Sequence, residues 1–267
     1  MGSPFALSAL DYRGMHVFRL RGDFTTLDIY TAALFELGAR GLEEKPGEVW
    51  AYFPERIELP LPGEWVELPD TDWIEAYKRD LKPVQAGPFV VLAPWHQWEG
   101  EEQRIRIEPG MAFGTGHHET TRMALETLAQ RIEPDMRVLD LGTGSGILAI
   151  GAALLGAEAV GVDIDPAVIP QAQENARLNN VQIRFLLGSL EDVEGPVDLV
   201  VANLFAELHA YLAGTYRQIF GVCGTLILTG ILLEREHIVR QALEAHSFSL
   251  LQRRQEGEWV CLTYAAV

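Results

Sequence analysis

The chain has 267 residues, of which 48% are hydrophobic and 22% are charged, and its formal net charge is −17. This composition is typical of a globular protein rather than a disordered one, and the length suffices for one large domain or for two. The negative charge repels phosphate backbones at long range, which argues against duplex nucleic acid as the main partner.

The chain begins with residues that show no periodicity and no basic start of a secretion signal, so we expect 1–14 to be a flexible extension. The longest apolar run, near residues 147–157, is too short to span a bilayer, so we expect no membrane contact. Cys223 and Cys261 have no C-x-x-C partner. This favours two small core residues of a reduced, cytoplasmic protein over a zinc site or a disulfide.

The pattern after Met15 predicts a small domain. A short alternating strand is followed by a helix that ends at a glycine and by two strands around Pro46-Gly47. Residues 54–70, rich in Pro and Glu, indicate a loop. We therefore predict a small α+β domain of the ferredoxin-like type over 15–70, suited to protein recognition. A helical pattern that Pro83 stops predicts a linker helix over 71–88.

From about Phe89, apolar strand-like runs alternate with helical patterns, and the chain ends in two strands around Glu256-Gly257. Nearly continuous apolar strands are typical of a parallel sheet that helices cover on both faces. For 89–267 we predict an α/β fold: a doubly wound, mostly parallel seven-stranded sheet that ends in an antiparallel hairpin.

A glycine-rich loop follows the first strand of that sheet. Gly142, Gly144 and Gly146 stand between a strand and a helix, where glycines allow a sharp turn and close approach of a ligand to the helix N-terminus. Asp163 ends the next strand, where a carboxylate can accept both hydroxyls of a ribose. The alternative is a tight turn and an unrelated surface aspartate.

Three features decide which nucleoside this loop favours. The dinucleotide fingerprint needs a third glycine where this chain has Ile147, and no phosphate-binding G-x-x-x-x-G-K-[ST] pattern is present. Asp140, two residues before the first glycine, opposes a pyrophosphate and suits a cationic ammonium or sulfonium group. We therefore predict S-adenosylmethionine rather than NAD as the cofactor.

The motifs "VLDLGTGSG" and "GVDIDP" and the terminal hairpin resemble those of class I S-adenosylmethionine-dependent methyltransferases. "EPGMAFGTGHHETT", "VDIDPAVIPQAQENARLNNV" and "VVANLFAEL" more specifically resemble the methyltransferase family that modifies ribosomal protein eleven of the large subunit. The resemblance implies methylation of lysine side-chain amines and of the N-terminal amine, with up to three methyls at each, on a basic ribosomal protein held by the small domain. It also implies cofactor contacts from Phe113, Thr121, Gly142, Gly144, Asp163 and Asn203.

Asn203 ends a strand at the carboxyl edge of the predicted sheet, where ligands of such sheets bind. Its side-chain carbonyl can accept an N–H from an amine, so we predict that Asn203 is the catalytic residue. Many amino-group methyltransferases have two prolines after this position, whereas this chain has Leu204 and Phe205. The alternative role for Asn203 is an N-cap of the following helix.

The paired histidines His117 and His118 raise the question of a metal site. A zincin helix needs H-E-x-x-H, and this chain has Arg122 where the second ligand would stand, so we predict no metal. Glu119 suits the first turn of a helix, and the loop before it is predicted to be a cofactor lid. We expect Glu207 and His209 at the surface, and Trp95 and Trp98 either beside the cleft or in packing contacts.

Rival interpretations remain open at this point. Another methyltransferase, acting on a glutamine side chain or on a nucleobase, is the nearest alternative. An NAD-dependent oxidoreductase and a non-catalytic module that only binds S-adenosylmethionine are the others. For the favoured function we expect a monomer that binds a ribosomal protein without direct nucleic-acid contact.

Overall fold

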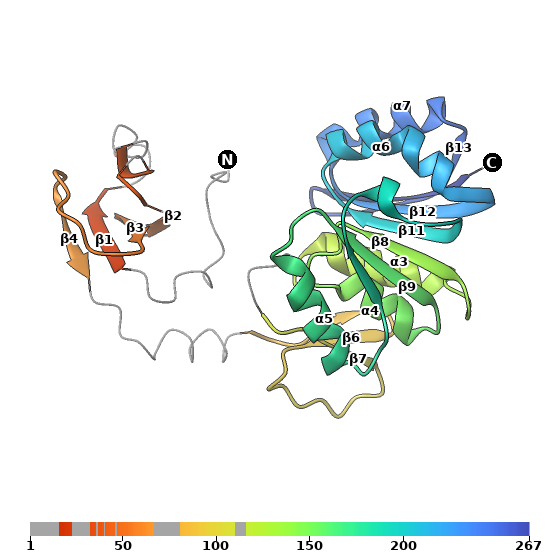
Figure 1. Ribbon diagram of the computed structural model, residues 1–267, viewed down its shortest axis with the longest axis horizontal. Coiled ribbons are helices and arrows are strands. Elements are labelled where there is room, and N and C mark those ends of the chain that lie inside the picture. Colours follow the sequence, from red (N-terminus) through yellow and green to blue (C-terminus); the bar gives the residue numbers. More distant parts are fainter. Residues whose placement is uncertain are drawn as a thin grey trace. The chain divides into compact units, whose positions relative to one another are not determined.

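The computed structural model describes residues 16–22, 33–35, 37–39, 41–45, 47–66, 81–109 and 116–266. Two compact units divide the chain, residues 1–81 and 82–267, and each is described by itself (Figure 1). The predictions for 1–14, for the helix over 71–80 and for Phe113 lie outside the described residues.

The smaller unit contains an antiparallel sheet in the order β2-β3-β1-β4. Phe18, Leu20 and Val49 belong to its main core, and Val17 and Tyr52 form a smaller separate cluster. This order is that of a ferredoxin-like sheet, although residues 54–62 are irregular where that fold has its second helix. The strands are β1 (His16–Arg21), β2 (Gly41–Lys45), β3 (Glu48–Phe53) and β4 (Gly63–Val66).

Strand β4 corrects the prediction that all of residues 54–70 form a loop. It pairs with β1 in antiparallel register, with Val17 opposite Val66 and Leu20 opposite Gly63. The segment is short and only partly buried, so its own sequence carries little alternation. Residues 63–66 form a strand because they pair with β1, which lies more than forty residues earlier in the chain. The local sequence pattern does not indicate this partner.

The larger unit begins with a small sheet in the order β5-β6-β7. Strand β5 (Val84–Ala86) is antiparallel to β6 (Phe89–Leu92), which is parallel to β7 (Gln103–Arg106). Residues 84–86 lie within the predicted linker helix over 71–88, but they form a strand. Their partner β6 follows directly after a tight turn.

The central sheet of the larger unit has the order β10-β9-β8-β11-β12-β14-β13. The first five strands are parallel, and β14 runs antiparallel to both β12 and β13. This confirms the predicted sheet with its terminal hairpin. The strands are β8 (Arg137–Leu141), β9 (Glu158–Asp163), β10 (Arg184–Leu187), β11 (Val197–Asn203), β12 (Phe220–Leu232), β13 (Phe248–Glu256) and β14 (Trp259–Ala266).

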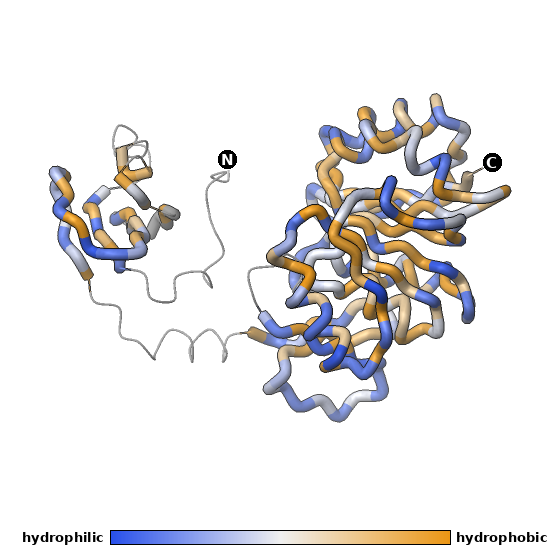
Figure 2. Tube along the Cα trace, viewed as in Figure 1, coloured by the Kyte–Doolittle hydropathy of each residue, from blue (hydrophilic) through white to orange (hydrophobic). Residues whose placement is uncertain are grey.

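Helices cover both faces of this sheet (Figure 1). Alternate residues of the central strands pack on opposite faces of the sheet. In β8, Val138 packs in the core with α3 and α4, and Leu139 packs in the core with α6 and α7. Figure 2 shows the resulting apolar strands between the helical layers. The helices are α3 (Glu119–Arg131), α4 (Ile147–Leu154), α5 (Val168–Leu178), α6 (Ala206–Ile219) and α7 (Glu236–Ala245), with short 3-10 turns at η1 (Leu190–Asp192) and η2 (Leu233–Arg235).

Two further observations concern surface and core. Cys261 is buried as predicted, but Cys223 is exposed, because it lies near the start of β12 in a stretch that the helices leave uncovered.

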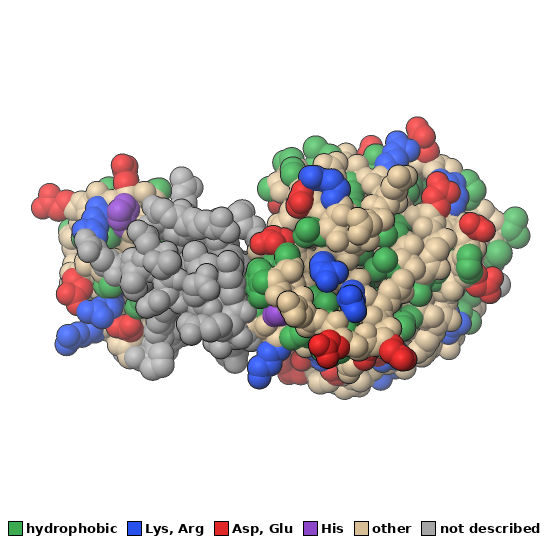
Figure 3. All heavy atoms as spheres, turned by 90° about the horizontal axis from the view of Figure 1, so that it is seen from below, with side chains coloured by type: hydrophobic (Ala, Val, Ile, Leu, Met, Phe, Trp, Pro, Cys, Tyr) green, Lys and Arg blue, Asp and Glu red, His purple; other side chains and the backbone are tan. Residues whose placement is uncertain are grey.

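On the face of the larger unit seen in Figure 3, basic side chains lie interspersed with acidic ones. Among the described residues, no helix has the length and apolar character needed to cross a membrane.

Candidate functional site

The glycine loop joins β8 to α4. Gly142, Gly144 and Gly146 have φ values of 72°, 50° and 82°, a backbone region that residues with a Cβ rarely adopt. A Cβ on Gly142 would lie 2.6 Å from Cδ2 of Leu204, so the Leu204 side chain would have to shift to admit it. The predicted sharp turn is confirmed.

Asp163 is bonded to this loop from the end of β9. Its Oδ2 accepts the backbone N–H of Gly144 at 3.0 Å, and its Oδ1 accepts the backbone N–H of Asp165 at 3.0 Å. A carboxylate has about four acceptor positions, so each oxygen can accept one further hydrogen bond. The Asp163 carboxylate is thus oriented and still able to receive two hydroxyls.

Asp140 lies behind the same loop and is buried. Its Oδ2 accepts the hydroxyl of Thr143 at 2.8 Å and the backbone N–H of Ala149 at 3.0 Å. Its Oδ1 is buried and has no hydrogen-bond partner among the described residues. Burial raises the pKa of Asp140 to about 7. A cationic group placed near Oδ1 would stabilise the carboxylate and lower that pKa.

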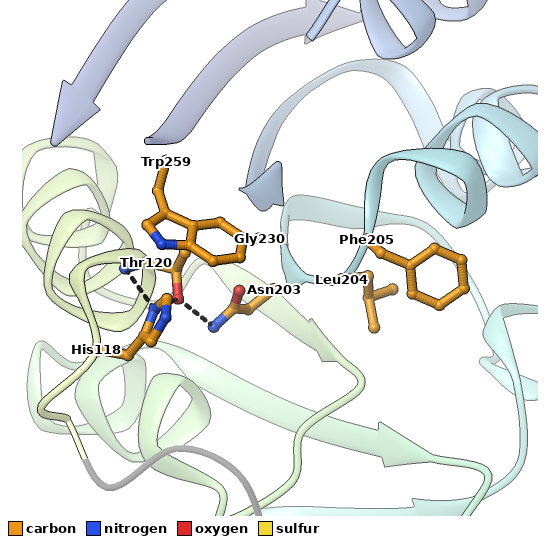
Figure 4. Close-up of a pocket in the computed structure, with 7 residues that line it drawn as sticks. All are labelled: His118, Thr120, Asn203, Leu204, Phe205, Gly230 and Trp259. Carbon is orange, nitrogen blue, oxygen red and sulfur yellow. Dashed lines mark hydrogen bonds between the residues drawn. The ribbon is translucent and has the colours of Figure 1, made fainter. Parts of the chain in front are cut away.

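A pocket of about 290 Å³ opens beyond the carboxyl end of β11, the strand adjacent to β8 (Figure 4). Asn203 ends that strand and donates from Nδ2 to Oγ1 of Thr120 at 3.2 Å. The two residues are far apart in sequence, and packing of α3 against β11 and β12 brings them together. The pocket is lined by His118, Thr120, Asn203, Leu204, Phe205, Gly230 and Trp259.

A chain of hydrogen bonds determines how the Asn203 amide is oriented. The ring Nδ1 of His118 accepts the backbone N–H of Thr120 at 3.3 Å, so this nitrogen carries no proton. The Thr120 hydroxyl, 2.8 Å away, therefore donates to it. The hydroxyl oxygen must then accept from Nδ2 of Asn203, which leaves Oδ1 as the free acceptor.

The alternative role of Asn203 as a helix cap is wrong. Helix α6 has Phe205 at its N-cap position, without a side-chain cap bond. His118 is instead the N-cap of α3, and Glu119 occupies the first turn as predicted. Nε2 of His117 lies 3.0 Å from the carbonyl oxygen of Lys82. Within the described parts of the chain, no three His, Cys, Asp or Glu side chains are grouped as metal ligands would be.

Thr121 is buried in the first turn of α3, and its hydroxyl oxygen has no partner in the part of the chain that the structure describes. Its neighbour Thr120, rather than Thr121, lines the pocket. A cofactor contact at Thr121 is compatible with this unpaired hydroxyl and stays a prediction, as does the contact predicted for Phe113.

Trp259 and His118 line the pocket, and sequence reasoning did not assign either to it. Their rings meet edge to face, with centroids 4.8 Å apart (Figure 4). Trp259 is the first residue of β14, directly after the hairpin turn. An aromatic residue at this strand end is the sequence feature that could have predicted its place beside the pocket. The predicted aromatic residues are elsewhere: Nε1 of Trp98 donates to Glu102, and Trp95 contacts the ring of His96.

His209 corrects a second prediction, because it is fully buried rather than at the surface. It belongs to the inward stripe of α6 together with Ala206, Ala213 and Tyr216. Its Nε2 lies 2.9 Å from the carbonyl oxygen of Thr229, and its Nδ1 lies 3.1 Å from the Tyr216 hydroxyl. The exposed position of Glu207 is confirmed.

Comparison with known proteins gives consistent matches. The profile of the family described as "Ribosomal protein L11 methyltransferase (PrmA)" matches residues 47–266. A ribosomal protein L11 methyltransferase from Thermus thermophilus is 58% identical over 252 residues, which cover 94% of this chain and 99% of that protein. The corresponding protein from Deinococcus radiodurans is 47% identical over 268 residues, covering 93% of this chain and 98% of that protein.

A solved structure is similar as well. The crystal structure of a ribosomal protein L11 methylase from Lactobacillus delbrueckii subsp. bulgaricus matches with a TM-score of 0.62 and 32% identity, covering 66% of this chain and 92% of that chain. These matches confirm the resemblance drawn from the motifs and the prediction that the chain is an enzyme, a methyltransferase. The chain belongs to the ribosomal protein L11 methyltransferase family.

Proposed function

We propose that this enzyme transfers methyl groups from S-adenosylmethionine to amines of a ribosomal protein. The observation that carries the proposal is Oδ1 of Asn203, which the bond from Nδ2 to Thr120 orients as an acceptor and which has no hydrogen-bond donor among the described residues. An acceptor at the carboxyl edge of the sheet, beside the glycine loop, suits a substrate that donates an N–H.

The residues around the loop suit S-adenosylmethionine, the methyl donor. The Asp163 carboxylate can accept the two ribose hydroxyls, and the loop glycines allow close approach of the methionine part. The buried Oδ1 of Asp140 has no protein partner among the described residues and can face a cation. When bound, the cofactor supplies a methyl carbon whose bond to a positively charged sulfur breaks, with its electron pair remaining on sulfur.

The acceptor amine must be neutral when it reacts, because its lone pair forms the new bond to carbon. A lysine amine has a pKa of about 10.4 in water, and transfer into an apolar pocket lowers it. Leu204, Phe205 and Trp259 provide apolar surface there. Oδ1 of Asn203 accepts one N–H and so directs the lone pair, and the proton lost after the first and the second transfer goes to water.

We infer the substrate from the relatives, which are named ribosomal protein L11 methyltransferases. We propose that this protein is also the substrate here, and that its lysine side chains and N-terminal amine receive up to three methyls each. Residues 15–70 would recognise the substrate, and 89–267 would carry the reaction, joined by 71–88. We further propose a cytoplasmic monomer that needs no direct nucleic-acid contact.

Mass spectrometry tests this proposal. The enzyme is incubated with isotopically labelled S-adenosylmethionine and purified, unmethylated ribosomal protein L11. We expect mass increases of one, two and three methyl groups on lysine residues and on the N-terminus. Label on glutamine, or no label at micromolar enzyme, would contradict the proposal. In a parallel reaction with ribosomal RNA in place of the protein, label on the RNA would also contradict it and favour the nucleobase alternative.

A further inference from the structure

A bulge in β12 shapes the floor of the pocket. Leu228 pairs with Leu262 and Ile231 pairs with Val260, so two residues of β12, Thr229 and Gly230, oppose a single residue of β14. Such a bulge bends a strand and redirects the groups next to it. Gly230 lies at the bulge with a φ of 80° and lines the pocket.

The bulge is held by hydrogen bonds from the neighbouring elements. The carbonyl oxygen of Thr229 accepts the backbone N–H of Leu204 at 3.1 Å and lies 2.9 Å from Nε2 of His209. The Thr229 hydroxyl donates to the carbonyl oxygen of Thr120 at 3.3 Å. The position of Gly230 relative to Asn203 is thus determined by β11, α3 and α6 together.

Gly230 leaves space beside the free acceptor of Asn203. A Cβ added to Gly230 would lie 2.8 Å from Oδ1 of Asn203 and 2.5 Å from the carbonyl oxygen of Leu204. Both distances are shorter than real Cβ contacts, and the Leu204 oxygen is backbone, so it has little freedom to move. Any side chain at this position would press on the oxygen that we assign to the amine.

The need for that space grows with each methyl group. A primary or monomethylated amine can offer an N–H to Oδ1 of Asn203, at about 2.9 Å between the heavy atoms. A neutral dimethylamine has no N–H, so a methyl group must face the oxygen instead. A carbon needs about 3.3–3.6 Å from an oxygen, so the dimethylamine requires a wider space than the N–H donor.

We propose that Gly230 is a specificity-determining residue that sets how many methyl groups one amine can receive. The inference rests on the proposed function. The missing side chain at position 230 gives the dimethylamine room to turn its lone pair to the methyl carbon. In that third transfer the lone pair forms the N–C bond, the C–S bond breaks with its electrons on sulfur, and a quaternary ammonium leaves without losing a proton.

The test compares Gly230→Ala with the wild-type enzyme on two forms of intact ribosomal protein L11, unmodified and reductively dimethylated at its amines. The measured quantity is the ratio of the transfer rates on the dimethylated and the unmodified form. For Gly230→Ala we expect this ratio to fall by at least about tenfold, because overpacking affects the bulkier acceptor more strongly. Transfer to unmodified protein should persist and stop mainly at fewer methyls.

Gly257→Ala is the matched control. Gly257 also has a positive φ, 58°, but a Cβ there would meet nothing within 4 Å. This variant carries similar backbone strain without filling the pocket, so its rate ratio should stay within about twofold of wild type. Thermal unfolding and calorimetric binding of S-adenosylhomocysteine verify that each variant is folded.

Gly230→Asn covers the case in which the alanine variant does not fold, since asparagine adopts positive φ more readily and still has a Cβ. A folded Gly230→Ala or Gly230→Asn with a wild-type ratio would overturn the inference while leaving the proposed function intact. So would a wild-type enzyme that methylates unmodified protein but never the dimethylated form. Absence of any transfer by the wild type would instead refute the proposed function.

Discussion

The amide of Asn203 acts through its orientation, and that orientation depends on two residues of another element. His118 accepts the Thr120 hydroxyl, and Thr120 in turn accepts the amide nitrogen. Because the acceptor oxygen is positioned before the substrate arrives, no reorganisation is needed during the reaction. In the proposed reaction Asn203 contacts the amine, and His118 and Thr120 act by orienting the Asn203 amide.

Replacing Asn203 tests this directly. For Asn203→Ala we expect kcat for ribosomal protein methylation to fall by about 10²–10³, as for the loss of one preorganised polar group in other enzymes. Binding of S-adenosylhomocysteine, measured by calorimetry, should change little. In Thr120→Val the amide loses its orienting partner but keeps its oxygen, so a smaller loss, about tenfold, is expected. Full activity of Asn203→Ala would remove this residue from the mechanism.

Asp140 has a cost in stability, and we propose that it also has a role in binding the cationic cofactor. Its folded pKa, about 7, lies above the ordinary value of 3.8. The stability that the protonated form contributes is fully present below about pH 4 and is lost as the pH rises towards 7. The carboxylate is retained in spite of this loss, which is what a site for a cationic ligand requires.

For Asp140→Asn we therefore expect opposite effects on stability and on binding. At pH 8 its free energy of unfolding, measured with urea, should exceed that of the wild type by about 1–4 kcal/mol, since a buried charge is removed. Its affinity for S-adenosylmethionine, measured by calorimetry, should fall at least about tenfold. An unchanged affinity would show that Asp140 does not face the cation.

At the scale of elements, α6 is attached to the pocket through His209. The ring lies close to the carbonyl oxygen of Thr229 in β12 and to the hydroxyl of Tyr216 on the same helix. Burial lowers the pKa of His209 to about 4, so the ring is neutral at neutral pH. The stability that it contributes is complete above about pH 6.5 and is lost as the pH falls towards 4.

Replacing this ring should therefore destabilise the fold. His209→Leu leaves the Tyr216 hydroxyl and the Thr229 carbonyl without this partner, and we expect a loss of about 2–4 kcal/mol in the free energy of unfolding at pH 7. The difference in the free energy of unfolding between His209→Leu and the wild type should decrease as the pH falls from 6.5 to 4. Glu207→Ala, on the exposed face of the same helix, is the control and should change stability by less than about 0.5 kcal/mol. Equal effects of the two substitutions would contradict this role.

At the scale of the whole molecule, the chain divides into two units, and we propose that one carries the chemistry and the other recognises the substrate. The glycine loop, Asp163, Asn203 and the pocket all belong to residues 82–267. The smaller unit has its own sheet and core. A separate core allows the smaller unit to carry the role in substrate recognition that we propose for it.

A fragment of residues 82–267 tests this division. We expect it to fold and to bind S-adenosylhomocysteine with nearly the affinity of the full chain, because the complete sheet is retained. Its kcat/KM for intact ribosomal protein L11 should fall by at least about 10², since the docking interactions are lost. Activity on a high concentration of a free lysine peptide should be retained. Wild-type kcat/KM on the intact protein would show that the smaller unit does not recognise the substrate.

Local patterns in the sequence were sufficient for the fold class and for the cofactor loop. Gly142, Gly144 and Asp163 were predicted because a tight turn and a strand end depend on residues close together in the chain. The mostly parallel seven-stranded sheet and its terminal hairpin were predicted from apolar runs, because nearly continuous apolar strands indicate a sheet covered on both faces. The identity of Asn203 and its place at the strand end could be predicted in the same way.

The tertiary structure alone decided how these residues are used. It buried His209, paired β4 with β1, placed Trp259 against His118, bound Asn203 to Thr120 and opened the space at Gly230. Each of these contacts joins segments that are distant in the chain, and periodicity within one segment carries no information about its partner. The sequence by itself determined the class of enzyme and the residue types of its site, and packing between α3, β11, β12 and β14 determined how the Asn203 amide is oriented at the pocket.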